Sequence, residues 1–135
     1  MTQNKIVVHY QDGRILRGFT GDFFATKPAF HLTPADAPQS SKPTEVLVAD
    51  LKAIFFVKDL AGIPKPRTRR QEFDPGKSIV GRKIRVIFKD QEILVGTTQG
   101  YDPNRPGFFV IPADDQGNNE RVFVVTGATR KVSFL

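Results

Sequence analysis

The sequence contains no cysteine, only two histidines and no long apolar run. Without cysteine there is no disulfide framework and no thiolate to serve as a nucleophile or metal ligand, a composition that suits a reducing compartment. No stretch approaches the roughly eighteen apolar residues of a membrane span, and the first ten residues lack the apolar core of a signal peptide. We therefore expect a cytoplasmic protein with no membrane partner.

The residues that usually carry catalysis are also sparse or badly spaced. His9 and His31 have no second histidine and no carboxylate pair at ligand spacing, so the sequence predicts no metal site. Gly76-Lys77-Ser78 matches the end of a phosphate-binding loop but lacks the opening glycine and the apolar strand before it. We expect no enzymatic activity, no catalytic residue and no cofactor.

What the chain does contain is an internal repeat. Sliding the sequence on itself places Lys5 on Lys83, an offset of 78 residues, and the alignment continues without a gap until Asp36 falls on Asp114. Thirteen of the aligned pairs are identical. Self-similarity over such a length takes priority over any local pattern, so we interpret the chain as a duplication.

The duplication divides the chain into three parts. We predict a first repeat at residues 1–60, a linker rich in basic residues and proline at residues 61–82, and a second repeat at residues 83–135. Each repeat is near the size at which a single core is only marginally stable. We therefore expect the repeats to pack against each other through apolar surface and to unfold together.

Within each repeat, apolar residues alternate with polar ones in short runs separated by turn residues, which is typical of β-strands. The expected strands are 5–10, 14–22, 28–32, 45–49 and 53–57 in the first repeat, and 84–88, 92–100, 107–111, 121–125 and 131–135 in the second. No segment predicts a helix. Closing five short, bent strands into a barrel buries the apolar face and removes the edges, so the predicted fold is all-β, with two tandem five-stranded β-barrels. The core positions expected to match are Ile6, Val8, Leu16 and Phe30 with Ile84, Val86, Leu94 and Phe108.

The turns and glycines of the two repeats differ. Asp12-Gly13 is a favoured two-residue hairpin turn, whereas Asp90-Gln91 lacks the glycine, so we expect a longer or different turn in the second repeat. Gly18 stands inside a predicted strand, where glycine marks a bulge or a close backbone approach.

The segment Asp12–Gly18 resembles the first half of the Sm signature, in which a DGR-type turn leads into a strand that contains a glycine. The repeats are thus similar to Sm-like and SH3-like small barrels. Membership of the Sm-like group would imply ring assembly and binding of single-stranded RNA through an asparagine after the second strand and an arginine-glycine pair before the last. The matching places read Asp102-Pro103-Asn104 and Thr126-Gly127, which lacks the arginine. The string GYxPxRPGFFxxPAD at Gly100–Asp114 also resembles a small uncharacterised bacterial module found alone or appended to signalling proteins.

Candidate binding residues lie in this string. Tyr101, Arg105 and Phe109, beside Phe108, are an aromatic and cationic set of the kind that stacks on bases or contacts a protein partner. The alternative is that Tyr101 and Phe108 fill the barrel core. Adjacent phenylalanines on a strand point to opposite faces, so Phe109 is expected either on the surface or buried between the two barrels.

The linker carries most of the positive charge. Between Lys58 and Lys83 there are eight basic and three acidic residues, which account for five of the six net positive charges of the chain. Arg67, Arg69 and Arg70 are therefore candidates for contact with phosphates or an acidic partner, the alternative being a solvated linker. These arginines also resemble the spaced arginines of PilZ domains, which would imply binding of cyclic di-GMP.

These observations leave two classes of function open. The first is a non-catalytic interaction module that binds an unknown protein partner or associates with itself. The alternative is binding of RNA or another nucleic acid or nucleotide through the basic linker, with cyclic di-GMP as the less favoured ligand.

Overall fold

The computed structural model describes residues 3–35, 42–60, 81–113 and 118–135, and within them the fold is all-β. The first half contains β1 (Asn4–Tyr10), β2 (Ile15–Thr20), β3 (Ala29–Pro34), β4 (Thr44–Leu47), the 3-10 turn η1 (Val48–Asp50) and β5 (Leu51–Val57). The second half contains β6 (Arg82–Phe88), β7 (Ile93–Thr98), β8 (Gly107–Pro112), β9 (Asn119–Val125), the 3-10 turn η2 (Thr126–Ala128) and β10 (Thr129–Phe134). Each expected strand is present at or close to its predicted position.

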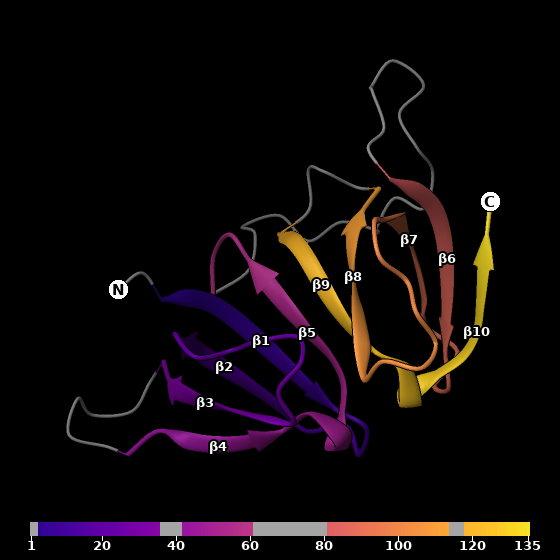
Figure 1. The fold of residues 1–135 in the computed structure, drawn as a ribbon. Helices are drawn as coiled ribbons and strands as arrows, with labels where there is room; N and C mark the ends of the chain where they lie inside the picture. The colour runs from indigo at the N-terminus through magenta and orange to yellow at the C-terminus, as the bar shows by residue number, and fades with distance from the viewer. Residues whose placement is uncertain (1–2, 36–41, 61–80, 114–117) are drawn as a thin grey trace.

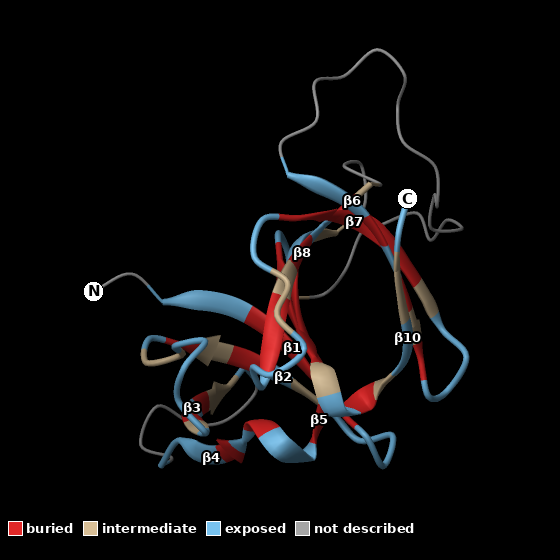
Figure 2. Ribbon diagram, turned by 45° about the vertical axis from the view of Figure 1, so that its right-hand side comes forward, coloured by how far each residue is buried: buried red, intermediate tan, exposed pale blue. Residues whose placement is uncertain are grey.

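The ten strands form one antiparallel sheet (Figure 1). Its order is β10-β6-β7-β8-β9-β5-β1-β2-β3-β4, so each half contributes five neighbouring strands and the last strand of each half lies beside its first. The expected closure into two separate barrels is not confirmed, because the hydrogen-bonded order is continuous and ends at β10 and β4. Burial follows this order, because the central strands are largely buried, β4 is mostly exposed, and β10 has only intermediate and exposed residues (Figure 2).

The halves meet where β5 pairs with β9, and we call this pairing the joint. Ile54 lies opposite Phe123, and Phe55 lies opposite Val122. The residues of β5 alternate between two cores, one on each face of the shared sheet. Because the joint strands are apolar on both faces, pairing them buries far more surface than a solvent-exposed strand could.

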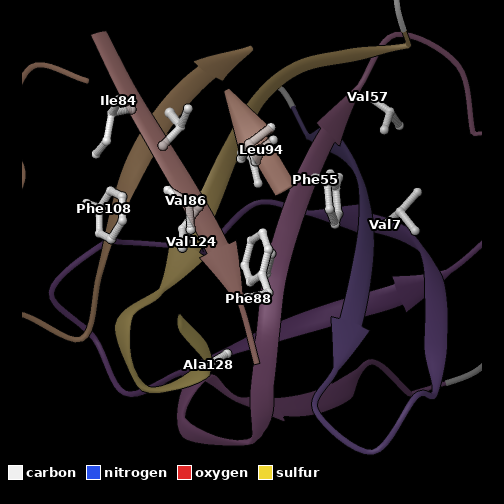
Figure 3. Close-up of a cluster of buried hydrophobic side chains, with 13 residues drawn as sticks. Val7, Phe55, Val57, Ile84, Val86, Phe88, Leu94, Phe108, Val124 and Ala128 are labelled. Atoms are coloured by element: carbon white, nitrogen blue, oxygen red, sulfur yellow. The ribbon is translucent and has the colours of Figure 1, made fainter. Parts of the chain in front are cut away.

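Each core takes residues from both halves. The core of the second half includes Val7, Ala53 and Phe55 from the first, and Figure 3 shows Val7 and Phe55 among its side chains. The core of the first half in turn includes Phe123 and Val125 from β9. The apolar packing between halves that the sequence predicts is therefore present, and it takes the form of interleaved cores.

Seven of the eight expected core residues are buried: Ile6, Val8, Phe30, Ile84, Val86, Leu94 and Phe108. The exception is Leu16, which is only half buried because it packs against the edge of its core. Its counterpart Leu94 is inaccessible to solvent.

The strand glycines mark a close backbone approach. A Cβ atom at Gly18 would overlap the carbonyl oxygen of Thr33, and one at Gly96 would overlap that of Ile111. The ladder between β1 and β2 has no register shift at Gly18, so of the two expected explanations the structure shows the close approach.

Both hairpins close with the same three-residue loop, so the expected two-residue turn at Asp12-Gly13 is wrong, and the second turn is longer than two residues but does not differ from the first. In both hairpins the last residue of the first strand donates its N–H to the carbonyl four residues on, at 2.9 Å. Gly13 adopts a φ of 97°, and Gln91 adopts a φ of 77° at the matching place. Gln91 is held there by its side chain, whose carbonyl oxygen accepts a hydrogen bond from Arg130 at 2.6 Å. This long-range contact stabilises the positive φ and could not be inferred from the turn sequence.

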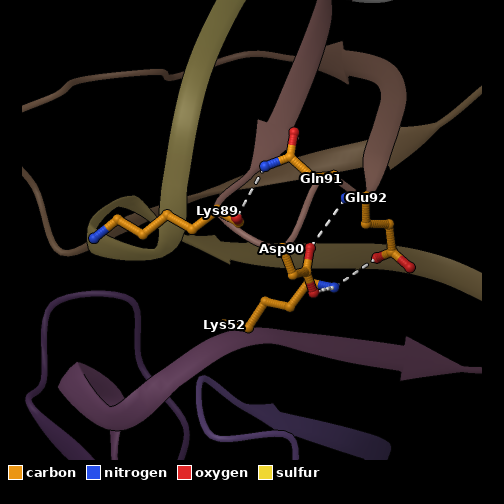
Figure 4. A network of polar contacts seen from close by, with 5 residues as sticks. All are labelled: Lys52, Lys89, Asp90, Gln91 and Glu92. Atoms are coloured by element: carbon orange, nitrogen blue, oxygen red, sulfur yellow. Dashed lines mark hydrogen bonds and ion pairs between the residues drawn. The ribbon is translucent and has the colours of Figure 1, made fainter.

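A polar cluster also connects the halves. The Nζ atom of Lys52, on β5, lies 2.7 Å from a carboxylate oxygen of Asp90 and 2.9 Å from one of Glu92, both in the second hairpin (Figure 4). The Lys52 side chain is 11% exposed, and its ammonium group lies 4.8 Å from the centre of the Phe88 ring. The hydrogen bond from Lys52 holds the pKa of Asp90 below its ordinary value.

Candidate functional site

The two described aromatic residues that the sequence singles out, Tyr101 and Phe109, lie in different places. Tyr101 follows β7 and packs against Phe108 and Phe134, with ring centres 4.8 and 5.6 Å apart. Phe109 points to the opposite side, where its ring lies 5.1 Å from that of Phe123 at the joint. The sequence left two positions open for Phe109, and the structure places it half buried between the halves. Tyr101 and Phe109 therefore do not form one platform.

Arg105 joins neither group. It is exposed in the turn after Tyr101, where its N–H donates to the carbonyl of Asp102 at 3.1 Å and its guanidinium lies 3.7 Å from the Asp102 carboxylate. Ion pairs between such exposed groups add little to stability. Arg67, Arg69 and Arg70 lie outside the described residues, so the structure does not place them.

Tyr101 and Phe134 line a pocket of about 340 Å³ at the end of the second half, together with Arg82, Thr98, Gln99 and Gly100. This volume lies within the range of roughly 300 to 1,000 Å³ that is usual for small-ligand sites. Phe134 is 39% exposed, which is unusual for a ring of that size. The guanidinium carbon of Arg82 lies 3.8 Å from the centre of the Phe134 ring, a cation–π contact. The site combines flat aromatic surface with positive charge.

The same place in the first half is built differently. Asp22 stands where the second half has Gly100, and its carboxylate accepts hydrogen bonds from the His31 backbone N–H at 2.9 Å and from the Thr20 hydroxyl at 3.2 Å. Burial raises the pKa of Asp22, but these hydrogen bonds and the His31 ring outweigh it, so the pKa lies below its ordinary value. A Cβ atom at Gly100 would meet nothing within 4 Å. The glycine thus leaves open a space that Asp22 and its partners occupy in the first half.

The strands beside the pocket are basic. β6 and β10 are neighbours in the sheet, and together they carry five exposed basic residues and no acidic one. The five are Arg82, Lys83, Arg85, Arg130 and Lys131. We call this pair of strands the basic edge. Its positive charge favours an anionic partner.

Arg82 and Phe134 were not among the residues that the sequence indicated. The repeat alignment contained a signal for Phe134, since it falls on Phe56, a ring that packs against Phe23. Arg82 falls on Asn4, so the alignment gave no indication of its stacking.

Within the part of the chain that the structure describes, no group of three or more histidine, aspartate or glutamate side chains could hold a metal ion. No helix of the described residues is long and apolar enough to cross a membrane.

Comparison with known proteins identifies the family and goes no further. Residues 2–135 match the family of unknown function DUF6982, so the chain belongs to that family. Neither the curated proteins nor the solved structures contain a match.

Proposed function

We propose that this member of the DUF6982 family is a non-catalytic interaction module that binds a protein partner at the edges of its sheet. The observation that carries this proposal is the open strand order, in which β10 and β4 each have one neighbour among the described residues. An exposed edge strand presents a row of backbone N–H and C=O groups, and adding an extended segment of a partner satisfies them.

We further propose that the halves are two copies of one small β unit of the Sm-like and SH3-like kind. β6 begins and ends 78 residues after β1, and the same offset relates β2 to β7 and β3 to β8. In both halves a 3-10 turn precedes the last strand, which returns to pair with the first. That arrangement supports two barrel-like units, with the predicted linker at residues 61–82 between them, although Arg82 already belongs to β6.

A hydrogen-exchange experiment tests the edge-binding proposal. Peptides selected from a random twelve-residue library for binding to the full chain are added to the protein, and protection of backbone amides is mapped. We expect new protection in β4 or β10, since strand addition covers edge amides. Protection confined to loops, or a failure to select any peptide, would contradict the proposal.

The basic edge favours a second candidate, binding of a nucleic acid or nucleotide. On β6 its charges continue the basic run of the linker, so the sequence joins these two groups of positive charge. Affinity for single-stranded RNA should then fall steeply with salt, with a log–log slope of roughly −0.7 per phosphate contact. Replacing Arg67, Arg69 and Arg70 by alanine should flatten the slope. A wild-type chain that binds neither RNA, single-stranded DNA nor cyclic di-GMP at low salt would exclude this function.

A further inference from the structure

The joint between β5 and β9 shows which side chains can pack against an edge strand of this fold. In the first half, Phe23 and Phe56 form a ring pair with centres 5.7 Å apart, and the second half contains the same pair as Tyr101 and Phe134, 5.6 Å apart. The two pairs are related by the 78-residue offset. Since the geometry is conserved between the halves, differences in what surrounds the rings are informative.

In the first half the ring pair is covered by the neighbouring strands β8 and β9. Phe123 on β9 lies 5.0 Å from Phe23 and is 1% exposed, and Phe109 on β8 lies 5.9 Å from Phe56. Within the described residues, Tyr101 contacts the ring of Phe108 on β8 as Phe23 contacts that of Phe30, but no ring from the other half packs against it. In the second half, the surface that corresponds to the one covered at the joint is instead partly exposed, and it continues into the pocket.

As far as the described ranges go, the backbone beside this ring pair is available for pairing. Leu135 donates its N–H to the carbonyl of Lys83 at 3.0 Å, and antiparallel ladders alternate between bonded and non-bonded pairs. The N–H groups of Val132 and Phe134 therefore point away from β6, toward the side on which β5 receives β9 in the first half. An added strand would find donors there.

A second copy of this chain lacks the residues to fill the place. Under the offset, Phe123 corresponds to Glu45 on β4, and Phe109 corresponds to His31 on β3, so the other edge of the molecule carries no ring at either position. Lys131 stands where the joint has Ala53, which is inaccessible to solvent. Covering Lys131 in the same way would bury an ammonium group without a partner, which costs several kcal/mol.

We propose that the β10 edge and the adjoining pocket bind an extended segment of a partner protein that carries one aromatic residue flanked by carboxylates. The segment adds as a strand to β10, its ring packs against Tyr101 and Phe134, and its carboxylates pair with Lys131 and Arg82. This inference rests on the proposed function and specifies the edge and the partner chemistry.

A strand of the protein itself supplies the probe. The peptide Asn119–Val125 already pairs with β5, and in that register residue 124 lies opposite Ala53, the counterpart of Lys131. The substitutions Arg121→Glu and Val124→Glu therefore place a carboxylate on each side of its single ring. The labelled peptide is titrated with the full chain, and binding is followed by fluorescence anisotropy. We expect the peptide with Phe123→Ala to bind at least about tenfold more weakly, because buried aromatic anchors dominate such interfaces. The peptide with native Arg121 should also bind more weakly, because it places positive charge against the basic edge.

Protein variants locate the site. Phe134→Ala removes one ring, and Gly100→Leu adds a side chain at a pocket-lining position where a Cβ meets no atom within 4 Å, so we expect both variants to keep the fold. Both should weaken peptide binding at least about tenfold. Leu47→Ala is the matched control, since Leu47 is 48% exposed on the opposite edge strand, and it should leave binding unchanged. Hydrogen exchange should show protection of the Val132 and Phe134 amides when the peptide is bound.

The outcomes separate this inference from the proposed function. Peptide binding that protects β4, or that does not depend on the Phe123 ring, would overturn the inference and leave the edge-binding proposal standing. Wild-type chains that associate through β10 in analytical ultracentrifugation would show that the occupant is a second copy and would also overturn it. Absence of binding to this probe at low salt would overturn the inference, and the random-library experiment then decides the proposed function independently.

Discussion

The β5 edge and the β10 edge stand at matching positions in the two halves, but among the described residues β5 is joined to another strand and β10 is open. Ala53 and Phe55 on β5 are buried, whereas the residues at their places on β10 are Lys131 and Ser133. The other two edges differ in the same way, because β9 carries Phe123 where β4 carries Glu45. The backbone path is alike, so side chains decide which edges of this fold pair with each other.

The largest loss of stability should come from removing the ring of Phe123, at the centre of the joint. Phe123→Ala takes away a side chain packed against rings of both halves, and we expect a loss of about 3 to 5 kcal/mol in the free energy of unfolding. The control Glu45→Ala, at the matching position of the open edge, should change it by less than about 0.5 kcal/mol. Urea denaturation measures both. Similar losses for the two variants would show that the joint and the open edge do not differ in how much their side chains stabilise the fold.

Exchanging residues between the joint and the open edge tests further whether side chains decide which edges pair. Ala53→Lys places at the joint the residue that β10 carries, and burying that charge without a partner should cost about 3 kcal/mol or more. Lys131→Ala should leave the free energy of unfolding nearly unchanged. We also expect the wild type to unfold in one calorimetric transition, because each core contains residues of both halves. A stable Ala53→Lys variant would show that the joint is less tightly packed than the structure indicates.

The two hairpin turns should differ by a smaller amount. Gly13→Ala forces a side chain into a positive φ and should cost about 1 kcal/mol. Gln91→Gly relieves the same strain but loses the hydrogen bond from Arg130, so we expect a gain of no more than about 0.5 kcal/mol. Thermal unfolding of the two variants provides the measurement. A large loss for Gln91→Gly would mean that the Arg130 contact outweighs the strain.

The smallest change in stability is expected from the protonation of Asp90 in acid. The hydrogen bond from Lys52 lowers the pKa of Asp90 below its ordinary value near 3.8, so the native state binds that proton less readily than the unfolded state. The contribution is present above pH 3.8 and disappears as the pH falls through the lower folded value. Asp90→Asn should remove it, with a loss at neutral pH of no more than about 1 kcal/mol, since Asp90 is 55% exposed.

Asp12 occupies the same position in the first hairpin and is the control for this measurement. The Arg14 backbone N–H lowers the pKa of Asp12, and the Arg14 side chain adds to the effect. Because Asp12 does not bond across the joint, Asp12→Asn should leave the coupling between halves unaltered. Equal acid sensitivity of the two variants in pH-dependent denaturation would show that the Lys52 cluster does not connect them.

Local patterns predicted the parts of this fold that depend on local geometry. Alternating residues indicated the strands, and Gly18 indicated a close backbone approach, because both follow from strand sterics. The joint depends on which strands meet across the whole chain, and neither β5 nor β9 contains a signal that names its partner. The same limitation applies to the site: Tyr101 was found as an aromatic residue near a turn, whereas its pairing with Phe134 depends on contacts between distant segments.

The joint is also the kind of contact by which repeated units assemble into a polymer. The joint is heterologous, because the edge formed by β5 meets a different edge, formed by β9. Heterologous contacts generate rings or open fibres when each added unit leaves a free edge for the next. At the two outer edges Glu45 and Lys131 stand where the joint has Phe123 and Ala53, and His31 stands where it has Phe109. Adding a further unit in the manner of the joint would bury the charged side chains of Glu45 and Lys131, which disfavours the addition. We infer that charge at both outer edges limits the array of described strands to two units.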